Sequence, residues 1–138
     1  MGTLVELNKI GPFRFEAKNA NGKLAIIDGP AKIGGTDDGV RPMEMILIGL
    51  AGCAVMDTLV ILNKQKQIVE ELKIEVDGER SDATPSPFNK IHLKFTAKGQ
   101  VDSNKLQKAI TMSIEKYCSV AVMLEKTAEI TWESQVLV

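Results

Sequence analysis

The sequence predicts an α+β fold in a single domain that covers residues 1–138. Several segments alternate apolar and polar residues with a period of two, which is typical of strands exposed on one face. A long and almost uncharged segment near the middle, and a second periodic segment near the end, have the patterns of helices. The resulting order of strands, long helix, strands, helix and strand favours helices packed on antiparallel sheet.

The first third of the chain has the pattern of strands. Phe13 and Phe15 alternate with polar neighbours, and residues 23–28 form a second short apolar run. Between these runs, residues 19–22 (Asn-Ala-Asn-Gly) favour a hairpin turn, because Asn and Gly tolerate positive φ. Residues 29–40 contain four glycines and predict a loop.

The long helix is expected to begin at Pro42 and to run to about Gln65. Proline suits the first helical position, because an N–H there would have no partner within the helix and its absence costs nothing. Its apolar residues cover nearly the whole circumference: Met45, Ile46, Leu47, Ile48, Leu50, Val55, Met56, Leu59, Val60, Ile61 and Leu62. A helix of this kind must be covered on every side, which a chain of 138 residues rarely achieves alone. We therefore expect part of its surface to face a partner subunit.

Two strands are expected after the long helix, at residues 72–77 and 90–97. In the second strand Ile91, Leu93, Phe95 and Ala97 share one face. His92, the single histidine, falls on the opposite and polar face. We expect His92 to be a surface residue without a special role, because a single histidine argues against a metal cluster or a Cys–His dyad.

A second helix is expected after residues 102–104 (Asp-Ser-Asn), which offer N-caps. Its apolar positions follow helical spacing as far as Tyr117, and Cys118 lies at its end. A short helical turn is expected at residues 120–124. The last segment, residues 128–138, alternates like a strand.

The composition excludes several functional classes. A hydrophobic share of 44% and a charged share of 25% are those of a soluble globular protein. A net charge of −1 with mixed signs provides no field for nucleic acid or an anionic membrane, and 4% aromatic residues argue against base stacking. The run from Met45 to Leu62 has only about the minimum length of a membrane span and contains Asp57. We expect a buried core helix, no targeting segment and a cytoplasmic location.

The two cysteines, Cys53 and Cys118, are the candidate chemical groups. A free cysteine often acts as a small buried hydrophobe, and on that interpretation the two sulfurs would lie too far apart to bridge. Two thiols that meet are instead equipped for two-electron redox chemistry. Small residues flank Cys53 and both thiols lie on helical segments, which favours the redox interpretation.

Residues 42–53 read PMEMILIGLAGC, and residues 115–124 read EKYCSVAVML. These segments resemble the first and second cysteine motifs of the OsmC/Ohr family of hydroperoxide-reducing proteins, and within it the YhfA-like branch. The resemblance covers nearly the whole chain. It implies an intertwined homodimer in which antiparallel sheets wrap around two long central helices.

The resemblance also implies a reaction. Cys53 would be the peroxidatic thiol, which attacks an organic hydroperoxide and becomes a sulfenic acid. Cys118 would resolve the sulfenic acid by forming a disulfide with Cys53, and an external dithiol or lipoyl-type reductant would reduce that disulfide. No cofactor and no metal is implied.

An activating pair is part of the peroxidase pattern: an arginine from the N-terminal strand region, held by a glutamate at the start of the cysteine helix. Arg14 lies in roughly the matching region, with Arg41 and Arg80 as alternatives. The residue at the glutamate position is Met43, and Glu44 follows it. One residue along a helix rotates a side chain by about 100°, so Glu44 departs from the family pattern.

A second hypothesis is a binding module for small molecules or acyl chains. Its apolar cleft at the dimer interface would be lined by Met45, Met56 and Met123. In this case the thiols would serve only as a redox sensor with little peroxidase turnover.

Overall fold

The computed structural model describes residues 2–138, which form two compact units, one ending at Ile46 and one beginning at Leu47. The first unit contains an antiparallel sheet of β1 (Val5–Lys9), β2 (Phe15–Asn19) and β3 (Leu24–Ile27), paired in that order. The sequence pattern predicted β2 and β3 but not β1. The single domain over residues 1–138 stays a prediction.

The predicted hairpin turn between β2 and β3 is confirmed. The side-chain oxygen of Asn19 accepts hydrogen bonds from the backbone N–H groups of Asn21 (3.0 Å) and Lys23 (2.9 Å). Gly22 has a φ of 76°, which an L side chain rarely adopts. The turn is thus fixed by one Asn side chain and one Gly backbone, the residue types that suggested it.

Asp28, at the end of β3, organises the glycine-rich loop that follows. Its carboxylate accepts the hydroxyl of Thr36 (2.7 Å) and the backbone N–H groups of Gly29 (2.8 Å) and Asp38 (3.1 Å). These bonds outweigh burial and hold the pKa of Asp28 below its ordinary value, the Thr36 bond having the largest effect. Residues 29–40 therefore form an ordered loop, which includes the short 3₁₀ turn Ala31–Ile33.

The long helix α1 (Pro42–Lys64) begins at the predicted proline and ends one residue before the expected Gln65. One stripe of it is buried, at residues four apart: Leu50, Ala54, Thr58 and Leu62. With a mean hydropathy of 2.3 over 18 residues, α1 is long and apolar enough to cross a membrane. The core helix of a soluble protein can have the same length and composition. Only 22% of that window is buried within the chain, so most of the apolar circumference predicted to need a cover is at least partly exposed.

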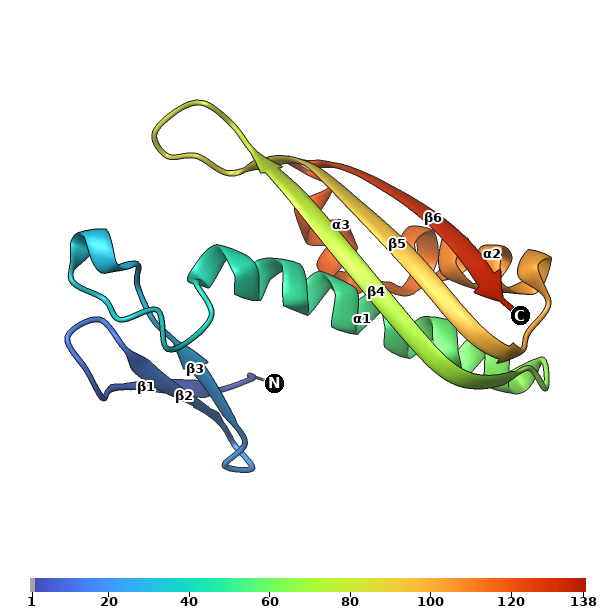
Figure 1. The fold of residues 1–138 in the computed structure, drawn as a ribbon, viewed down its shortest axis with the longest axis horizontal. Coiled ribbons are helices and arrows are strands. Elements are labelled where there is room, and N and C mark those ends of the chain that lie inside the picture. Colours follow the sequence, from blue (N-terminus) through green and yellow to red (C-terminus); the bar gives the residue numbers. More distant parts are fainter. Residues whose placement is uncertain (1) are drawn as a thin grey trace. The chain divides into compact units, whose positions relative to one another are not determined.

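The second unit holds a twisted sheet of three strands: β4 (Ile68–Arg80), β5 (Phe88–Gln100) and β6 (Glu129–Leu137), with β5 in the middle (Figure 1). β4 pairs with β5 in the antiparallel sense, but β6 pairs with β5 in the parallel sense. The expectation of purely antiparallel sheet is therefore wrong here. The connection from β5 to β6 contains helices and can cross the sheet, as parallel pairing requires.

Between β5 and β6 the chain forms α2 (Ser103–Met112), a π-helical turn, η2 (Ser113–Tyr117), and the short helix α3 (Ser119–Leu124). Asp102 caps α2 as predicted, because its carboxylate accepts the backbone N–H of Lys105 at 3.0 Å. The indole N–H of Trp132 on β6 donates to the Thr111 hydroxyl at 3.2 Å and ties α2 to the sheet.

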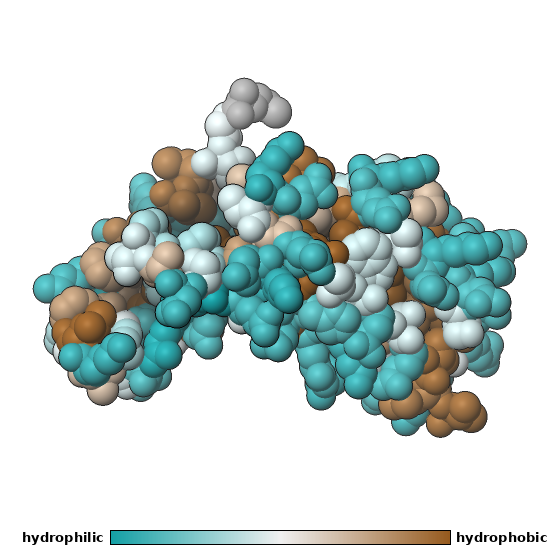
Figure 2. Space-filling model, turned by 90° about the horizontal axis from the view of Figure 1, so that it is seen from above, coloured by the Kyte–Doolittle hydropathy of each residue, from teal (hydrophilic) through white to brown (hydrophobic). Residues whose placement is uncertain are grey.

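The core lies on the face of this sheet that packs against the helices. The predicted apolar face of β5 is confirmed, because Ile91, Leu93, Phe95 and Ala97 are at most 1% exposed. Burial of each large side chain stabilises the fold by about 1.5–3 kcal/mol. The opposite face of the sheet is mostly hydrophilic, as seen from above in Figure 2.

Gly78 on β4 allows this close packing. A Cβ at position 78 would lie 2.6 Å from the ring of Phe88 and 3.1 Å from the Leu47 side chain of α1. Any larger residue would therefore push α1 or Phe88 away from the sheet.

Candidate active site

The structure brings together the two predicted cysteines, which lie in the same unit. Cys53 is in the middle of α1, and Cys118 is the residue between the π-helical turn and α3. Both are free thiols, and Cys53 lies close enough to Cys118 to contribute to the raised pKa of the Cys118 thiol. The proximity of the two thiols argues against the interpretation of the cysteines as core-filling residues, which expects the sulfurs to lie too far apart to bridge.

The two thiols have different environments. Cys118 is fully buried, whereas Cys53 is half-buried. Burial is the main cause that raises the pKa of the Cys118 thiol, from 9.0 to about 11, and the neighbouring Cys53 thiol raises it further. The backbone N–H of Ala121, which donates to Cys118 Sγ at 3.3 Å, acts in the opposite direction and lowers it. Cys118 is therefore a neutral thiol at pH 7, and its S–H can donate to a Cys53 thiolate.

The space beside Cys53 is open within the chain. Among residues 2–138, no heavy atom outside the local helix backbone lies within 4 Å of the position that a Cβ would take at Gly49 or Gly52. The small residues around Cys53 thus leave one side of α1 accessible. A small reactant or a second polypeptide chain can approach the sulfur from this side.

Two buried hydroxyl groups converge on the backbone next to Cys53. Thr58 and Ser113 each donate to the carbonyl oxygen of Ala54, both at 2.8 Å. Thr58 lies one turn later on α1, whereas Ser113 begins the π-helical turn that leads to Cys118. Sequence reasoning missed both residues, because a Ser or Thr inside a helical pattern gives no sign of a partner on another helix.

The residues of the predicted activating pair have partners of their own. The guanidinium of Arg14 contacts the Asp38 carboxylate at 2.9 Å and the Thr36 hydroxyl at 3.4 Å. The carboxylate of Glu44 accepts the backbone N–H of Arg41 at 2.8 Å and so caps the start of α1. A catalytic role for Arg14 or Glu44 stays a prediction.

The alternative arginines are also engaged. Arg41 forms an ion pair with Asp37 at 2.7 Å, and Arg80 donates to the backbone oxygen of Ser86 at 2.8 Å. The surface position predicted for His92 is confirmed, and its ring contacts Thr131 and Glu133 on the outer face of the sheet. Within residues 2–138, no three His, Cys, Asp or Glu side chains gather as a metal site would require.

A groove of about 420 Å³ opens beside the second half of α1. Its lining is mainly apolar, with Asp57, Lys64 and Gln65 as its polar members, and comprises Asp57, Val60, Ile61, Lys64, Gln65, Met112 and Tyr117. Asp57 lies one turn after Cys53, and Tyr117 precedes Cys118. The groove is large enough for a small apolar ligand near the thiols.

Comparisons with known proteins identify the family of this chain. Residues 35–133 match the family described as OsmC-like protein. Protein YhfA of Escherichia coli K12 is 35% identical over 124 residues, which cover 89% of this chain and 90% of that protein.

Solved structures share the fold over the whole chain. A hypothetical protein from Aquifex aeolicus VF5 is 30% identical, with a TM-score of 0.82 over 100% of this chain and 99% of the other. An organic hydroperoxide resistance protein from Elizabethkingia anophelis is 16% identical, with a TM-score of 0.70 over 98% of this chain and 97% of the other. The family match and the relationship to YhfA show that the chain belongs to the OsmC-like protein family.

Proposed function

We propose that this protein reduces organic hydroperoxides with Cys53 as the attacking thiol and Cys118 as the resolving thiol. The observation that carries the proposal is the contact between a half-buried Cys53 and a fully buried, protonated Cys118. An organic hydroperoxide resistance protein of the same fold supports the choice of substrate class.

The reaction would proceed in three balanced steps. The Cys53 thiol attacks the terminal oxygen of the hydroperoxide, which yields a Cys53 sulfenic acid and releases an alcohol. Cys118 then attacks the Cys53 sulfur, which forms the disulfide and releases water. An external dithiol, such as a lipoyl group, reduces the disulfide and is itself oxidised to a cyclic disulfide.

The environment of each thiol suits its role in these steps. The half-buried Cys53 can meet a peroxide, and the S–H of Cys118 can stabilise the attacking thiolate by a hydrogen bond. Because Cys118 is buried and protonated, a bulky peroxide is kept from oxidising it first. The order in which the two cysteines react thus follows from burial.

The first test uses one equivalent of cumene hydroperoxide under anaerobic conditions. The wild-type protein should lose two mass units as the Cys53–Cys118 disulfide forms. Cys118→Ser should stop at a Cys53 sulfenic acid that dimedone traps, and Cys53→Ser should leave the peroxide unconsumed. Peroxide consumption by Cys53→Ser at the wild-type rate would contradict the proposal.

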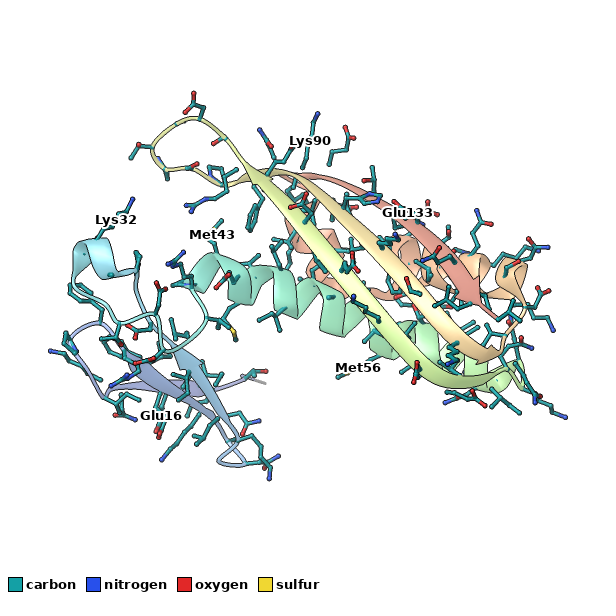
Figure 3. All side chains as sticks on the ribbon, in the orientation of Figure 1. Glu16, Lys32, Met43, Met56, Lys90 and Glu133 are labelled. Carbon is teal, nitrogen blue, oxygen red and sulfur yellow. The ribbon has the colours of Figure 1, made fainter. Side chains whose placement is uncertain are left out.

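We further propose that the protein is a homodimer in which a partner covers α1. The exposed side chains of α1 support this, since Met56 is 69%, Val60 53% and Ile48 51% exposed. Met56 projects from α1 away from the β4–β5–β6 sheet (Figure 3). An apolar surface of this kind is typical of a subunit interface.

Sedimentation velocity tests this assembly with a matched pair of variants. Met56→Glu should shift the protein toward the monomer, because a charge would be buried at the interface. Lys90→Glu, on the outer face of β5, should leave the wild-type mass unchanged (Figure 3). A wild-type protein that sediments as a monomer at micromolar concentration would refute the dimer.

The groove beside α1 favours a second candidate function, the binding of a small molecule or acyl chain. Val60, Ile61 and Met112 give it an apolar lining. Saturable binding of a fluorescent fatty acid that is unchanged in Cys53→Ser would favour this function. The cytoplasmic location stays a prediction.

A further inference from the structure

Ser113 links the backbone next to one cysteine to the backbone of the other. Its side chain is fully buried, and its hydroxyl donates to the carbonyl oxygen of Ala54, the residue that follows Cys53. Its own carbonyl oxygen accepts the backbone N–H of Cys118 at 2.7 Å. Two hydrogen bonds through this single residue therefore connect the two thiol-bearing segments.

The turn that begins at Ser113 is a π-helix, in which a backbone N–H bonds to the carbonyl five residues earlier. A regular α-helix would direct the N–H of Cys118 to Ile114. The wider turn holds one more residue, which rotates the residues that follow it by about 100° relative to an uninterrupted α-helix. The direction in which Cys118 leaves α2 thus depends on the turn that Ser113 anchors to α1.

We propose that Ser113 is a positioning residue that sets the placement of the Cys118 thiol relative to Cys53, and through it the rate of disulfide formation. This inference rests on the proposed function of the two thiols. It assigns to a buried hydroxyl the task of holding the π-helical turn against α1. Without that hydroxyl, the turn relaxes and the two sulfurs spend less time within reaction distance.

Thr58 provides a matched control within the same chain. Its hydroxyl donates to the same Ala54 oxygen at the same distance as Ser113, and Thr58 is also fully buried. The Thr58 bond lies inside α1, however, and connects no second helix. Ser113→Ala and Thr58→Val therefore each remove one buried donor, and only the first removes a link between the cysteine segments.

The experiment measures pairing of the thiols with diamide, an oxidant that takes two electrons and two protons from a dithiol and becomes a hydrazine. Disulfide formation is followed by quenched alkylation and mass spectrometry, and its equilibrium is read in dithiothreitol buffers. In Ser113→Ala we expect disulfide formation to be about tenfold slower, because even a small misplacement of two reacting groups lowers the rate of their reaction strongly. In Thr58→Val we expect a change of less than about twofold, with a similar loss of thermal stability.

Equal pairing rates in the two variants, or a wild-type rate in Ser113→Ala, would overturn the inference. Ser113→Thr keeps the donor, and recovery of most of the rate in that variant would support the role of the hydroxyl. Diamide separates this result from the proposed function. A wild-type protein that pairs with diamide but ignores cumene hydroperoxide refutes the peroxidase proposal and leaves the Ser113 test intact.

Discussion

The titration of Cys118 provides a direct test of the site's electrostatics. In the Cys53→Ser variant Cys118 is the only cysteine, and once Tyr117 is also replaced by Phe, because tyrosinate absorbs in the same region, the absorbance at 240 nm reports the Cys118 thiolate alone. Burial is the largest cause of its raised pKa and remains in this variant. We therefore expect a midpoint above 9.0, and below the value of about 11 that applies with Cys53 present.

The size of the effect follows from the two pKa values. At pH 8, a thiol with a pKa of 9.0 is about one-tenth ionised, and one with a pKa of about 11 is about one-thousandth ionised. Alkylation of Cys118 in the wild-type protein should therefore be about 100-fold slower than in the unfolded chain from protonation alone. Iodoacetamide labelling of Cys118 with and without 8 M urea, about the concentration that unfolds most domains, should give at least this ratio, because burial also blocks access to the thiol.

The same shift predicts how stability depends on pH. Because the folded protein holds the Cys118 proton more tightly than the unfolded chain, its contribution is complete below pH 9 and is lost as the pH rises toward 11. The difference between the two pKa values corresponds to roughly 3 kcal/mol of unfolding free energy. The Cys118→Ala variant should not show this loss of unfolding free energy at alkaline pH. A Cys118 midpoint at or below 9.0 in the folded Cys53→Ser variant would refute the reasoning from burial.

Three further predictions concern local structure. Asp102→Ala should lower the free energy of unfolding by about 1 kcal/mol in urea titrations, whereas Asp102→Asn should retain most of the cap. Lys66 has a φ of 60°, so Lys66→Gly should stabilise the protein by about 0.5–1 kcal/mol, and a loss would contradict strain at this residue. The pKa of Asp28 is lowered, so its stabilisation is present above pH 3.8 and is lost as the pH falls through the lower folded value. Amide exchange at Gly29 and Asp38 should accelerate in that acid range, and Asp28→Ala should show the fast exchange already at pH 6.

Most of the fold could be predicted from local patterns. Pro42 marked the start of α1, Asp102 marked the start of α2, and the alternation around Phe95 identified the buried face of β5. In each case the decisive interaction lies within a few residues of the signal, or depends on a simple period. Such interactions are visible in the sequence because no distant partner is needed to explain them.

The errors concern interactions between distant segments. The parallel pairing of β6 with β5 depends on how the intervening helices cross the sheet, which alternation alone does not reveal. β1 was missed although Val5 and Leu7 alternate with polar residues, because the strand has only five residues and none of them is buried within the chain. Ser113 was missed for the same kind of reason, since its partner Ala54 lies on another helix.

The sequence identified the two thiols of the candidate site but not the residues that surround them. The resemblance of two motifs to the OsmC/Ohr family implied in advance that Cys53 and Cys118 form a pair. The raised pKa of Cys118 could not be predicted, because it arises from the burial of this thiol in the folded chain. Arg14 and Glu44 were selected by position, and the structure gives each a partner that no motif specifies.

The distance along the chain between the contacting thiols has a consequence for stability. Cys53 and Cys118 lie about 65 residues apart, with β4, β5 and α2 between them. A disulfide at this contact would close a large loop in the unfolded chain and raise the free energy of unfolding by about 4 kcal/mol on the chain-entropy model. The oxidised protein would then resist heat better than the reduced one. Its melting temperature would thus record whether it has recently met an oxidant.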